Sequence, residues 1–440
     1  MLDETTTPLP SRRHAAPAPA DSSGRAPSPR TNVWLTRLLV VGLVLAAVNL
    51  RPAITSLGAL LEDVRAGLHM SGGVAGVLTS VPALCFAVFG VTAPRLARRF
   101  GPATVVCAGM VAITAGLLIR PFTDGTAAFL AASALALMGI AVGNVLMPVI
   151  VKRYFPDRVG TMTGLYSMSL SAGTAVAAAA TVPMTSALGG SWRLGLGLWA
   201  VVAAVAVLPW AALLVRDRKD AASRTTAGPD AGHRPRPEPA PAPAVAAAPR
   251  ITRSRTAWAL GCFFGLQATG AYITMGWMPQ IFRDAGVSAG TAGLLLAVTM
   301  VMGVPLAFVI PRLATRMRNQ GPIVVALGAC GLTGYAGLFL APAAGAWVWA
   351  VLLGVSNCAF PLALTMIGMR ARTGAGIVKL SAFAQSTGYL ISIPGPLLVG
   401  VLYESSGGWE LPITLMGGLM VPQIILGVVA GRDRVIEDEA

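Results

Sequence analysis

Apolar residues occur in runs of about 20 along almost the whole chain, and short polar stretches with Gly, Pro or charged residues separate the runs. A helix of that length spans the hydrocarbon core of a bilayer. The pattern predicts twelve such helices, which begin near Trp34, Val74, Pro102, Thr126, Met162, Leu194, Thr256, Thr291, Pro322, Ala346, Val378 and Glu410. We therefore expect an all-α membrane protein.

Two long segments break this pattern because they are rich in Pro, Ala and Arg and hold too few apolar residues to pack. We expect a disordered tail at residues 1–32 and a disordered linker at 216–255. The linker separates a six-helix bundle at 33–215 from a second at 256–431, and a tail follows at 432–440.

The two predicted bundles repeat one another. An offset of 217 positions maps residues 71–78 onto 288–295, Pro-Arg-Leu-Ala at 94–97 onto 311–314, and Trp192 onto Trp409. Each bundle has an even number of spans, so the two copies run parallel about an axis along the membrane normal. In transporters with such repeats, the substrate site lies between the two halves.

Charge supports this topology. Hydrophobic residues make up 55% of the 440 and charged residues 12%, yet the formal net charge is +15. Nearly all Lys and Arg lie in the tails and in loops on one side, with Arg65, Arg120, Arg193 and Arg283 on the other and Arg51 and Lys379 inside spans. This asymmetry predicts that both termini and the linker are cytoplasmic in the plasma membrane. The excess of positive charge indicates contact with anionic membrane lipids and gives no support to nucleic-acid binding.

Arg51 is the most informative single residue. It lies about 21 Å beyond Arg37 along the first predicted helix, well inside a hydrocarbon core of about 30 Å. A guanidinium at that depth is costly and marks a substrate path by default, although it could also extend to the outer interface. Thr55 and Gly58 share its helical face, where small residues leave room for an anion or form a helix–helix contact.

Other polar residues inside spans are candidates for substrate contact. Some have a plainer alternative: Trp277 at the membrane interface, the two asparagines in helix–helix bonding, and Lys379 extending to the inner interface. The candidate substrate-binding set is Arg51, Thr55, Asn144, Gln267, Tyr272, Trp277, Asn357, Gln385 and Tyr389.

Missing residue types narrow the function further. No Asp, Glu or His lies deep within a span, and the five cysteines lie one per span without paired spacing. We therefore expect no metal, no cofactor and no catalytic centre, since an enzyme would need a nucleophile with a base, a metal set or clustered carboxylates. A sensor would need a soluble output domain, for which the linker is too short.

Several motifs resemble a known family. Asn-Leu-Arg-Pro-Ala at 49–53, Gly143-Asn144-Val-Leu-Met-Pro148 and Gln267…Tyr272…Trp277-Met-Pro279 are similar to the cyanate permease and 2-nitroimidazole transporter (CynX/NimT-type) family of the major facilitator superfamily. The resemblance covers all twelve predicted spans. It implies the major facilitator fold and a monomeric secondary carrier that moves a small-molecule substrate by alternating access.

The substrate stays open at this stage. The resemblance implies a small anion such as cyanate or a small polar heterocycle, with Arg51 as the charge that faces it. The alternative is a broad-specificity drug or metabolite exporter of the same superfamily. Because Arg98 and Thr315 replace the acidic residue that normally follows Leu-Ala in the superfamily's short loop, the interlocking role of that loop does not carry over directly.

Overall fold

The computed structural model describes residues 33–226 and 251–439, which are helical along most of their length. The first half contains α1 (Val33–Asn49), α2 (Pro52–Ala59), α3 (Leu61–Gly67), α4 (Gly72–Phe100), α5 (Pro102–Ile119), η1 (Arg120–Phe122), α6 (Thr126–Tyr154), η2 (Pro156–Arg158), α7 (Val159–Ala187) and α8 (Trp192–Thr226). The second half contains η3 (Ile251–Arg253), α9 (Arg255–Asp284), α10 (Ala289–Val301), α11 (Gly303–Arg316), α12 (Gly321–Leu340), α13 (Ala346–Asn357), α14 (Ala359–Met369), α15 (Gly374–Ser392), α16 (Pro394–Ser406), α17 (Glu410–Ala430) and η4 (Ile436–Asp438).

These helices make twelve passes through the molecule, six in each half, as the hydrophobic pattern predicts. Four passes consist of two consecutive helices: α1–α2, α10–α11, α13–α14 and α15–α16. Within the described residues, eleven segments are long and apolar enough to cross a membrane. The remaining pass is α9, whose buried polar residues, among them Gln267 and Gln280, lower its hydropathy.

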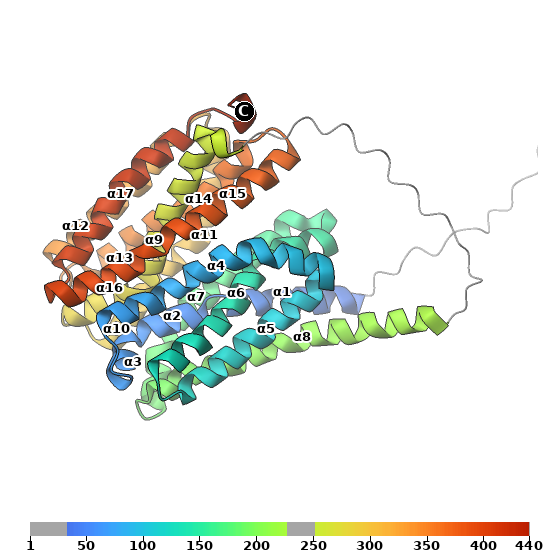
Figure 1. Cartoon of the computed structure of the whole chain (residues 1–440). Coiled ribbons are helices and arrows are strands. Elements are labelled where there is room, and N and C mark those ends of the chain that lie inside the picture. Colours follow the sequence, from blue (N-terminus) through green and yellow to red (C-terminus); the bar gives the residue numbers. More distant parts are fainter. Residues whose placement is uncertain (1–32, 227–250, 440) are drawn as a thin grey trace, which may run out of the picture.

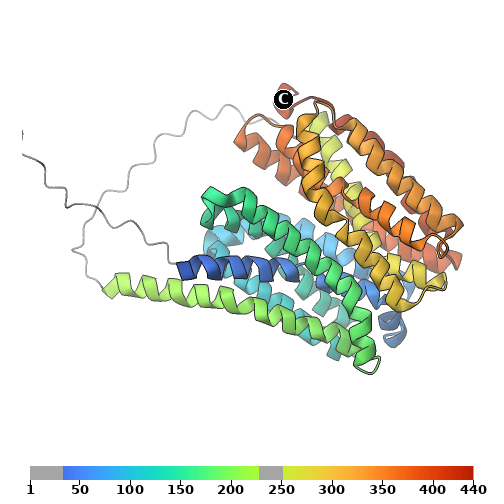
Figure 2. The same ribbon diagram turned by 180° about the vertical axis from the view of Figure 1, so that it is seen from behind.

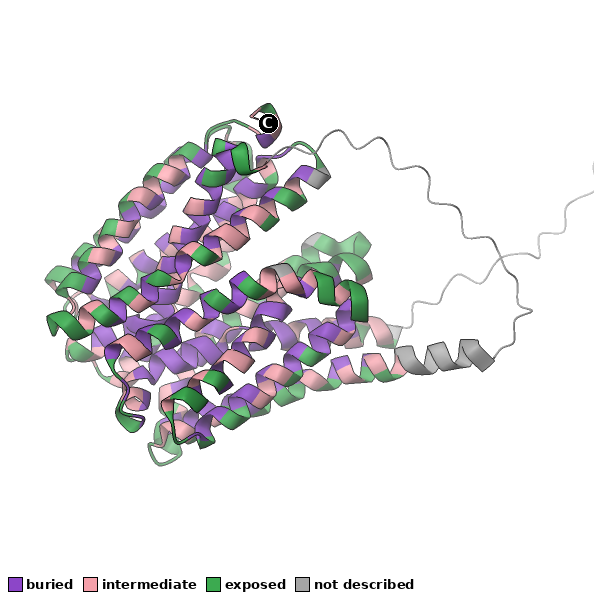
Figure 3. Ribbon diagram, viewed as in Figure 1, coloured by how far each residue is buried: buried purple, intermediate pink, exposed green. Residues whose placement is uncertain are grey.

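The two halves form separate bundles that lie side by side (Figures 1 and 2). We call the end where α8 finishes and α9 starts the linker end, and the opposite end, with the loops at 68–71, 285–288 and 407–409, the distal end. Large apolar side chains on the outer helices face outward, including Leu208 of α8 and Ile425 of α17, which are 65% and 58% exposed. Figure 3 shows such exposed positions along the outer sides of α8, α12 and α17, as a lipid-facing surface requires.

The internal repeat has a structural basis at the helix starts. Ser71 caps α4 by accepting a hydrogen bond from the Val74 N–H, and Ser288 caps α10 by accepting one from the Thr291 N–H. A side-chain oxygen at this position satisfies a backbone donor that the first helical turn leaves free. The two serines are related by the 217-residue offset, so the repeat preserves the start of the second pass in each half.

The halves meet closely near the distal end. Arg283 of α9 forms ion pairs with Glu62 (2.9 Å) and Asp63 (3.2 Å) of α3. The Gly73 N–H at the start of α4 donates to Glu404 of α16 at 2.9 Å. A Cβ added to Gly76 would lie 2.8 Å from the carbonyl oxygen of Leu397, so α4 and α16 approach each other at a distance that a side chain would prevent.

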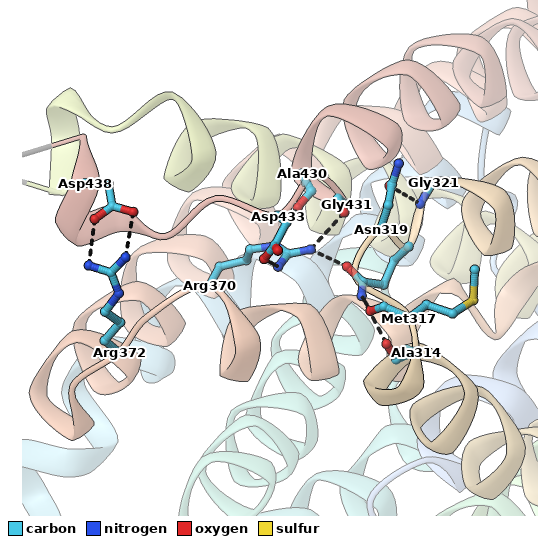
Figure 4. A network of polar contacts seen from close by, with 11 residues as sticks. Ala314, Met317, Asn319, Gly321, Arg370, Arg372, Ala430, Gly431, Asp433 and Asp438 are labelled. Carbon is cyan, nitrogen blue, oxygen red and sulfur yellow. Dashed lines mark hydrogen bonds and ion pairs between the residues drawn. The ribbon is translucent and has the colours of Figure 1, made fainter.

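At the linker end, a polar network joins the helix ends of the second half (Figure 4). The Arg370 side chain is 1% exposed and donates to the carbonyl oxygens of Ala430 (3.0 Å) and Gly431 (2.8 Å) and to Gln320. Gln320 in turn donates to Ala314 and Met317, which lie at the end of α11. One buried guanidinium therefore connects the ends of α11, α14 and α17.

Two boundaries differ from the sequence prediction. Helix α8 continues to Thr226, about ten residues into the predicted linker, and η3 and the start of α9 occupy 251–255. Within the predicted tail at 432–440, the described residues 432–439 are structured, because Ile436 of η4 packs into the core and Glu437 and Glu439 accept hydrogen bonds from the bundle. The predicted disordered residues 1–32 and the rest of the linker, 227–250, lie outside the described residues.

Candidate functional site

Helix interruptions mark the middle of the molecule. α1 ends at Asn49 and α2 starts at Pro52, so Arg51 lies in the break with backbone angles φ −129° and ψ −28°. α13 and α14 are likewise separated at Cys358, just after Asn357. Pro52 promotes the first break because proline lacks the N–H that would continue the helix. Backbone groups that are free of helical bonding are tolerated at such depth where they line a cavity or are buried in protein.

A cavity of about 340 Å³ lies between the two halves beside these breaks. Residues from both halves line it, so the site belongs to neither bundle alone. Its polar lining residues are Arg51, Thr163, Ser167, Ser171, Thr174, Gln267, Tyr272, Thr299, Asn357 and Tyr389. Its apolar wall includes Met275, Met300, Phe308, Phe360 and Leu364.

Arg51 is the charged residue of this lining, among the residues that the structure describes. Its guanidinium lies close enough to the phenols of Tyr166, Tyr272 and Tyr389 to act on each electrostatically, and within hydrogen-bonding reach of that of Tyr272. Within residues 33–226 and 251–439, no Asp or Glu lines the cavity. The positive charge is therefore surrounded by neutral polar groups and not neutralised by an adjacent carboxylate.

The aromatic residues hold this part of the cavity in place. Tyr389 of α15 stacks on Phe86 of α4 with ring centroids 4.9 Å apart and an interplanar angle of 22°. Phe264 of α9 packs edge-on against Tyr389 at 5.2 Å, and Phe86 also lies 6.3 Å from Tyr272. Phe86 thus joins the two halves at the level of the cavity and fixes the orientation of both tyrosine rings.

Gln267 faces the cavity from α9 and is only 4% exposed. Its Nε2 donates to the backbone carbonyl of Asn357 at 3.4 Å, at the break between α13 and α14. Its Oε1 is buried and has no hydrogen-bond partner among the described residues.

Five of the nine sequence candidates line the cavity: Arg51, Gln267, Tyr272, Asn357 and Tyr389. The other four do not. Thr55 is fully buried and donates to the carbonyl of Arg51 at 3.3 Å, while Gln385 donates along its own helix to Ser381 at 2.7 Å. Both side chains are occupied by local bonds, which explains why neither reaches the cavity.

Asn144 and Trp277 serve contacts between helices. Asn144 donates to Ile140 and accepts from Tyr166 at 3.2 Å, so it bonds α6 to α7. Trp277 is 0% exposed and donates to Thr79 of the other half at 3.2 Å, with its ring 6.0 Å from that of Trp409. It is therefore part of the closed distal end and neither a cavity wall nor an interfacial anchor.

Helix α7 supplies lining residues that the sequence reading missed. Thr163, Ser167, Ser171 and Thr174 are spaced by four, four and three positions, which places them on one helical face. Their common face is a signal that could have identified them, although α7 carries further hydroxyl residues on its other faces. The same described part of the chain contains no cluster of His, Cys, Asp or Glu that could hold a metal ion.

Comparison with known proteins agrees with this architecture. The Major Facilitator Superfamily profile matches residues 38–378. An uncharacterised transporter of Bacillus subtilis, YycB, is 34% identical over 415 residues, which cover 93% of this chain and 97% of that protein. The 2-nitroimidazole transporter of Escherichia coli is 31% identical, covering 91% of this chain and 96% of that protein, and the E. coli cyanate transport protein CynX is 28% identical, covering 87% and 95%.

A solved structure confirms the fold. The nucleoside transporter NupG superimposes with a TM-score of 0.68 over 90% of this chain and 98% of that protein. At 14% sequence identity this likeness concerns the fold alone. Twelve helices in two parallel bundles, as the sequence pattern predicts, are thus the arrangement of a known class of membrane proteins.

Proposed function

Because the chain belongs to the Major Facilitator Superfamily and is a membrane transporter rather than an enzyme, we propose that it carries a small anion or a small polar heterocycle by alternating access. The observation that carries this proposal is Arg51, a guanidinium in a central cavity that no carboxylate of the described residues lines. A cation substrate would meet a like charge there, whereas an anion or a nitro or carbonyl oxygen would accept its hydrogen bonds.

Cavity size and shape support a substrate larger than a three-atom anion. At about 340 Å³ the cavity has the volume of roughly ten water molecules, so it accommodates a substituted five- or six-membered ring. Tyr272 and Tyr389 offer neutral donors and flat surfaces for such a ring. The names of the two characterised relatives, which refer to 2-nitroimidazole and cyanate, cover both classes.

Substitution of Arg51 tests the proposal. Arg51→Ala is expected to weaken binding of the substrate by about 3 to 5 kcal/mol, by analogy with removal of one partner from a buried ion pair, which is more than a hundredfold in Kd. Arg51→Lys restores binding only in part, because an ammonium lacks the planar two-pronged donor set. Thermal-shift binding to the purified protein, with cyanate and 2-nitroimidazole as probes, measures both effects.

Lys379→Ala is the matched control, because Lys379 is a basic residue of a transmembrane helix that does not line the cavity. Its binding should equal that of the unmodified protein. Unchanged affinity in a folded Arg51→Ala protein would remove Arg51 from the site and with it the basis of the proposal.

A second candidate function is broad-specificity export. It is favoured by the apolar wall of Met275, Met300, Phe308 and Phe360, because methionine and aromatic side chains adapt to varied ligands. Under this alternative, intact cells that express the protein extrude lipophilic dyes, and Arg51→Ala leaves that efflux unchanged. Counterflow of small anions or azoles without dye efflux favours the first candidate.

A further inference from the structure

The amide of Gln267 has a fixed orientation. Its partner is the backbone carbonyl of Asn357, which can only accept a hydrogen bond. Rotating the amide by 180° would place Oε1 against that carbonyl, so that two acceptors face each other. The contact at 3.4 Å therefore directs Nε2 to the helix break and leaves Oε1 as the free end of the side chain.

Oε1 of Gln267 is an acceptor without a donor. It is buried, and none of the described residues donates to it, although the residue lines the cavity. A buried acceptor without a partner is costly, and the cost ends when a donor arrives from the ligand or from water.

None of the other polar groups of the cavity, among the described residues, donates a hydrogen bond to Oε1 of Gln267. Arg51 can only donate. The hydroxyl groups of Ser167, Ser171 and Tyr272 rotate to donate or to accept, so they impose no fixed requirement on a ligand. The side-chain amide of Asn357 carries both a donor and an acceptor and can turn either one to a ligand, because none of the described residues fixes it by a hydrogen bond. Two groups of fixed polarity thus remain, a donor at Arg51 in the first half and an acceptor at Gln267 in the second.

We infer that Gln267 selects substrates that carry an N–H or O–H donor in addition to the negative or electron-rich group bound by Arg51. This inference rests on the proposed function and narrows its two substrate classes to one. An N–H heterocycle with an electron-rich substituent satisfies both groups. Cyanate has no donor and leaves Oε1 unpaired, so it is a poor ligand.

Three probes of nearly equal shape isolate the role of the donor. 2-Nitroimidazole carries the ring N–H, 2-nitrothiazole has sulfur in its place, and 1-methyl-2-nitroimidazole has a methyl group on the nitrogen. Binding to the purified full-length protein is measured by thermal shift, at a pH low enough to keep the imidazole N–H protonated. The expected result is binding of 2-nitroimidazole about five- to a hundredfold tighter than either analogue, as the cost of an unpaired buried acceptor implies.

Gln267→Met provides the matched variant, because Met has a similar length and no strong acceptor. In this variant the preference for the N–H probe should fall to near unity, while 1-methyl-2-nitroimidazole binds as well as before. If the variant does not fold, equal binding of the three probes to the unmodified protein still overturns the inference.

Three results would overturn the inference while leaving the proposed function intact, two from the comparison of ligands and one from the variant. One is equal, Arg51-dependent binding of all three probes, and the other is tighter binding of cyanate than of 2-nitroimidazole. A preference for the N–H probe that persists in Gln267→Met would show that shape and not Oε1 selects it, which also overturns the inference. If Arg51→Ala left the affinity for all three probes unchanged, this result would contradict the proposed function itself.

Discussion

Individual buried charges in this protein have two different structural roles. Arg370 donates from Nε and one terminal nitrogen to two carbonyl oxygens and an amide, and its other terminal nitrogen lies 3.8 Å from the carboxylate of Asp433. Arg120 is equally buried, at 1% exposed, yet it makes one hydrogen bond, to the carbonyl of Ala53 at 3.2 Å, and lies 5.7 Å above the ring of Phe129. Its Nε and one terminal nitrogen have no partner in the described part of the chain. Such a group costs desolvation energy that its single bond does not recover.

We therefore predict that Arg120→Met raises the thermal unfolding midpoint of the purified protein or leaves it unchanged. Met retains most of the length of the side chain and removes the charge. Replacing poorly paired buried charges by apolar side chains can raise the free energy of unfolding by about 1 to 4 kcal/mol. Arg370→Met is the comparison, and we expect it to lower the midpoint because it leaves several carbonyls unpaired. A large drop for Arg120→Met would mean that a bound ion or water satisfies the guanidinium.

For individual residues, the sequence predicts several that line the cavity but does not predict the role of every candidate. Arg51, Gln267 and Tyr389 were recognised because polar groups deep in apolar helices are costly and therefore informative. The sequence leaves two roles open for the face that carries Thr55, an anion pocket or a helix–helix contact. Thr55 does not line the cavity, because its side chain is buried and bonds to the carbonyl of Arg51 one turn earlier in the same helix. The use of Trp277 in the closed distal end depends on Thr79 and Trp409, which are far away in the chain, and no local pattern contains that information.

At the scale of elements, the C-terminal segment acts as a clasp, by which we mean Val435–Glu439. Glu439 accepts from the N–H of Thr256 (3.0 Å) and the hydroxyl of Ser254 (2.7 Å) at the start of α9. Glu437 accepts from the N–H groups of Arg372 and Thr373 before α15. The clasp thereby joins the linker ends of α9 and α15, the two helices that carry Gln267 and Tyr389.

The clasp predicts a specific pH dependence. Partial burial opposes ionisation of Glu437 and Glu439, but the hydrogen bonds from Arg372, Thr373, Thr256 and Ser254 outweigh it and hold the pKa of both carboxyls below the usual value. A lowered pKa in the folded state stabilises the protein above the unfolded pKa of about 4.3, and the contribution disappears as the pH falls through the folded pKa.

We expect Glu437→Ala with Glu439→Ala to lower stability at neutral pH by up to about 1 kcal/mol, after allowance for solvent screening. The difference from the unmodified protein should vanish under acidic conditions, which thermal unfolding across a pH series measures. Asp157→Ala, an exposed acid in η2 at the same end, is the control and should leave stability unchanged. A difference that persists undiminished at low pH would contradict the role of the ionised carboxylates.

The helices and the C-terminal segment also show which boundaries the sequence patterns predict and which they do not. Their starts were predicted within a few residues, because caps such as Ser71 and prolines such as Pro102 leave local signals. The extension of α8 to Thr226 is not predicted by the sequence, because a charged segment without apolar periodicity is compatible with either a helix or a linker. The sequence assigns the clasp to a tail. Its acidic residues bind backbone groups of elements far away in the chain, and no local pattern in the sequence shows these contacts.

At the scale of the whole molecule, the charge asymmetry predicts which end faces the cytoplasm. In a background without the five native cysteines, Asp157→Cys lies in a loop at the linker end and Asp124→Cys in an exposed loop at the distal end. We expect a membrane-impermeant thiol reagent to label Asp124→Cys in intact cells and Asp157→Cys only after lysis, because the basic loops stay inside. The reverse labelling would invert the topology.

The closed distal end predicts a second global property. A Cβ on Gly73 would lie 3.8 Å from a methyl group of Val401 in the other half, so Gly73→Cys with Val401→Cys is close to disulfide geometry. Oxidation of this pair should abolish substrate flux in liposomes, since alternating access requires the halves to separate there. Reduction should restore flux, and each single-cysteine protein should transport in both conditions. Full flux in the oxidised protein would rule out separation of α4 from α16.

The isolated charge of the cavity also has an electrical consequence. Movement of one elementary charge through the full membrane potential involves about 2.3 kcal/mol per 100 mV. Under the proposed function, in which the halves rock and Arg51 binds the substrate, Arg51 passes through part of that field. A bound monoanion neutralises Arg51, so voltage acts only on the return of the empty carrier. A neutral heterocycle leaves the charge in place, so the loaded and empty carriers respond to voltage alike. The voltage dependence of exchange and of net flux thus reports the charge of the substrate that Arg51 binds.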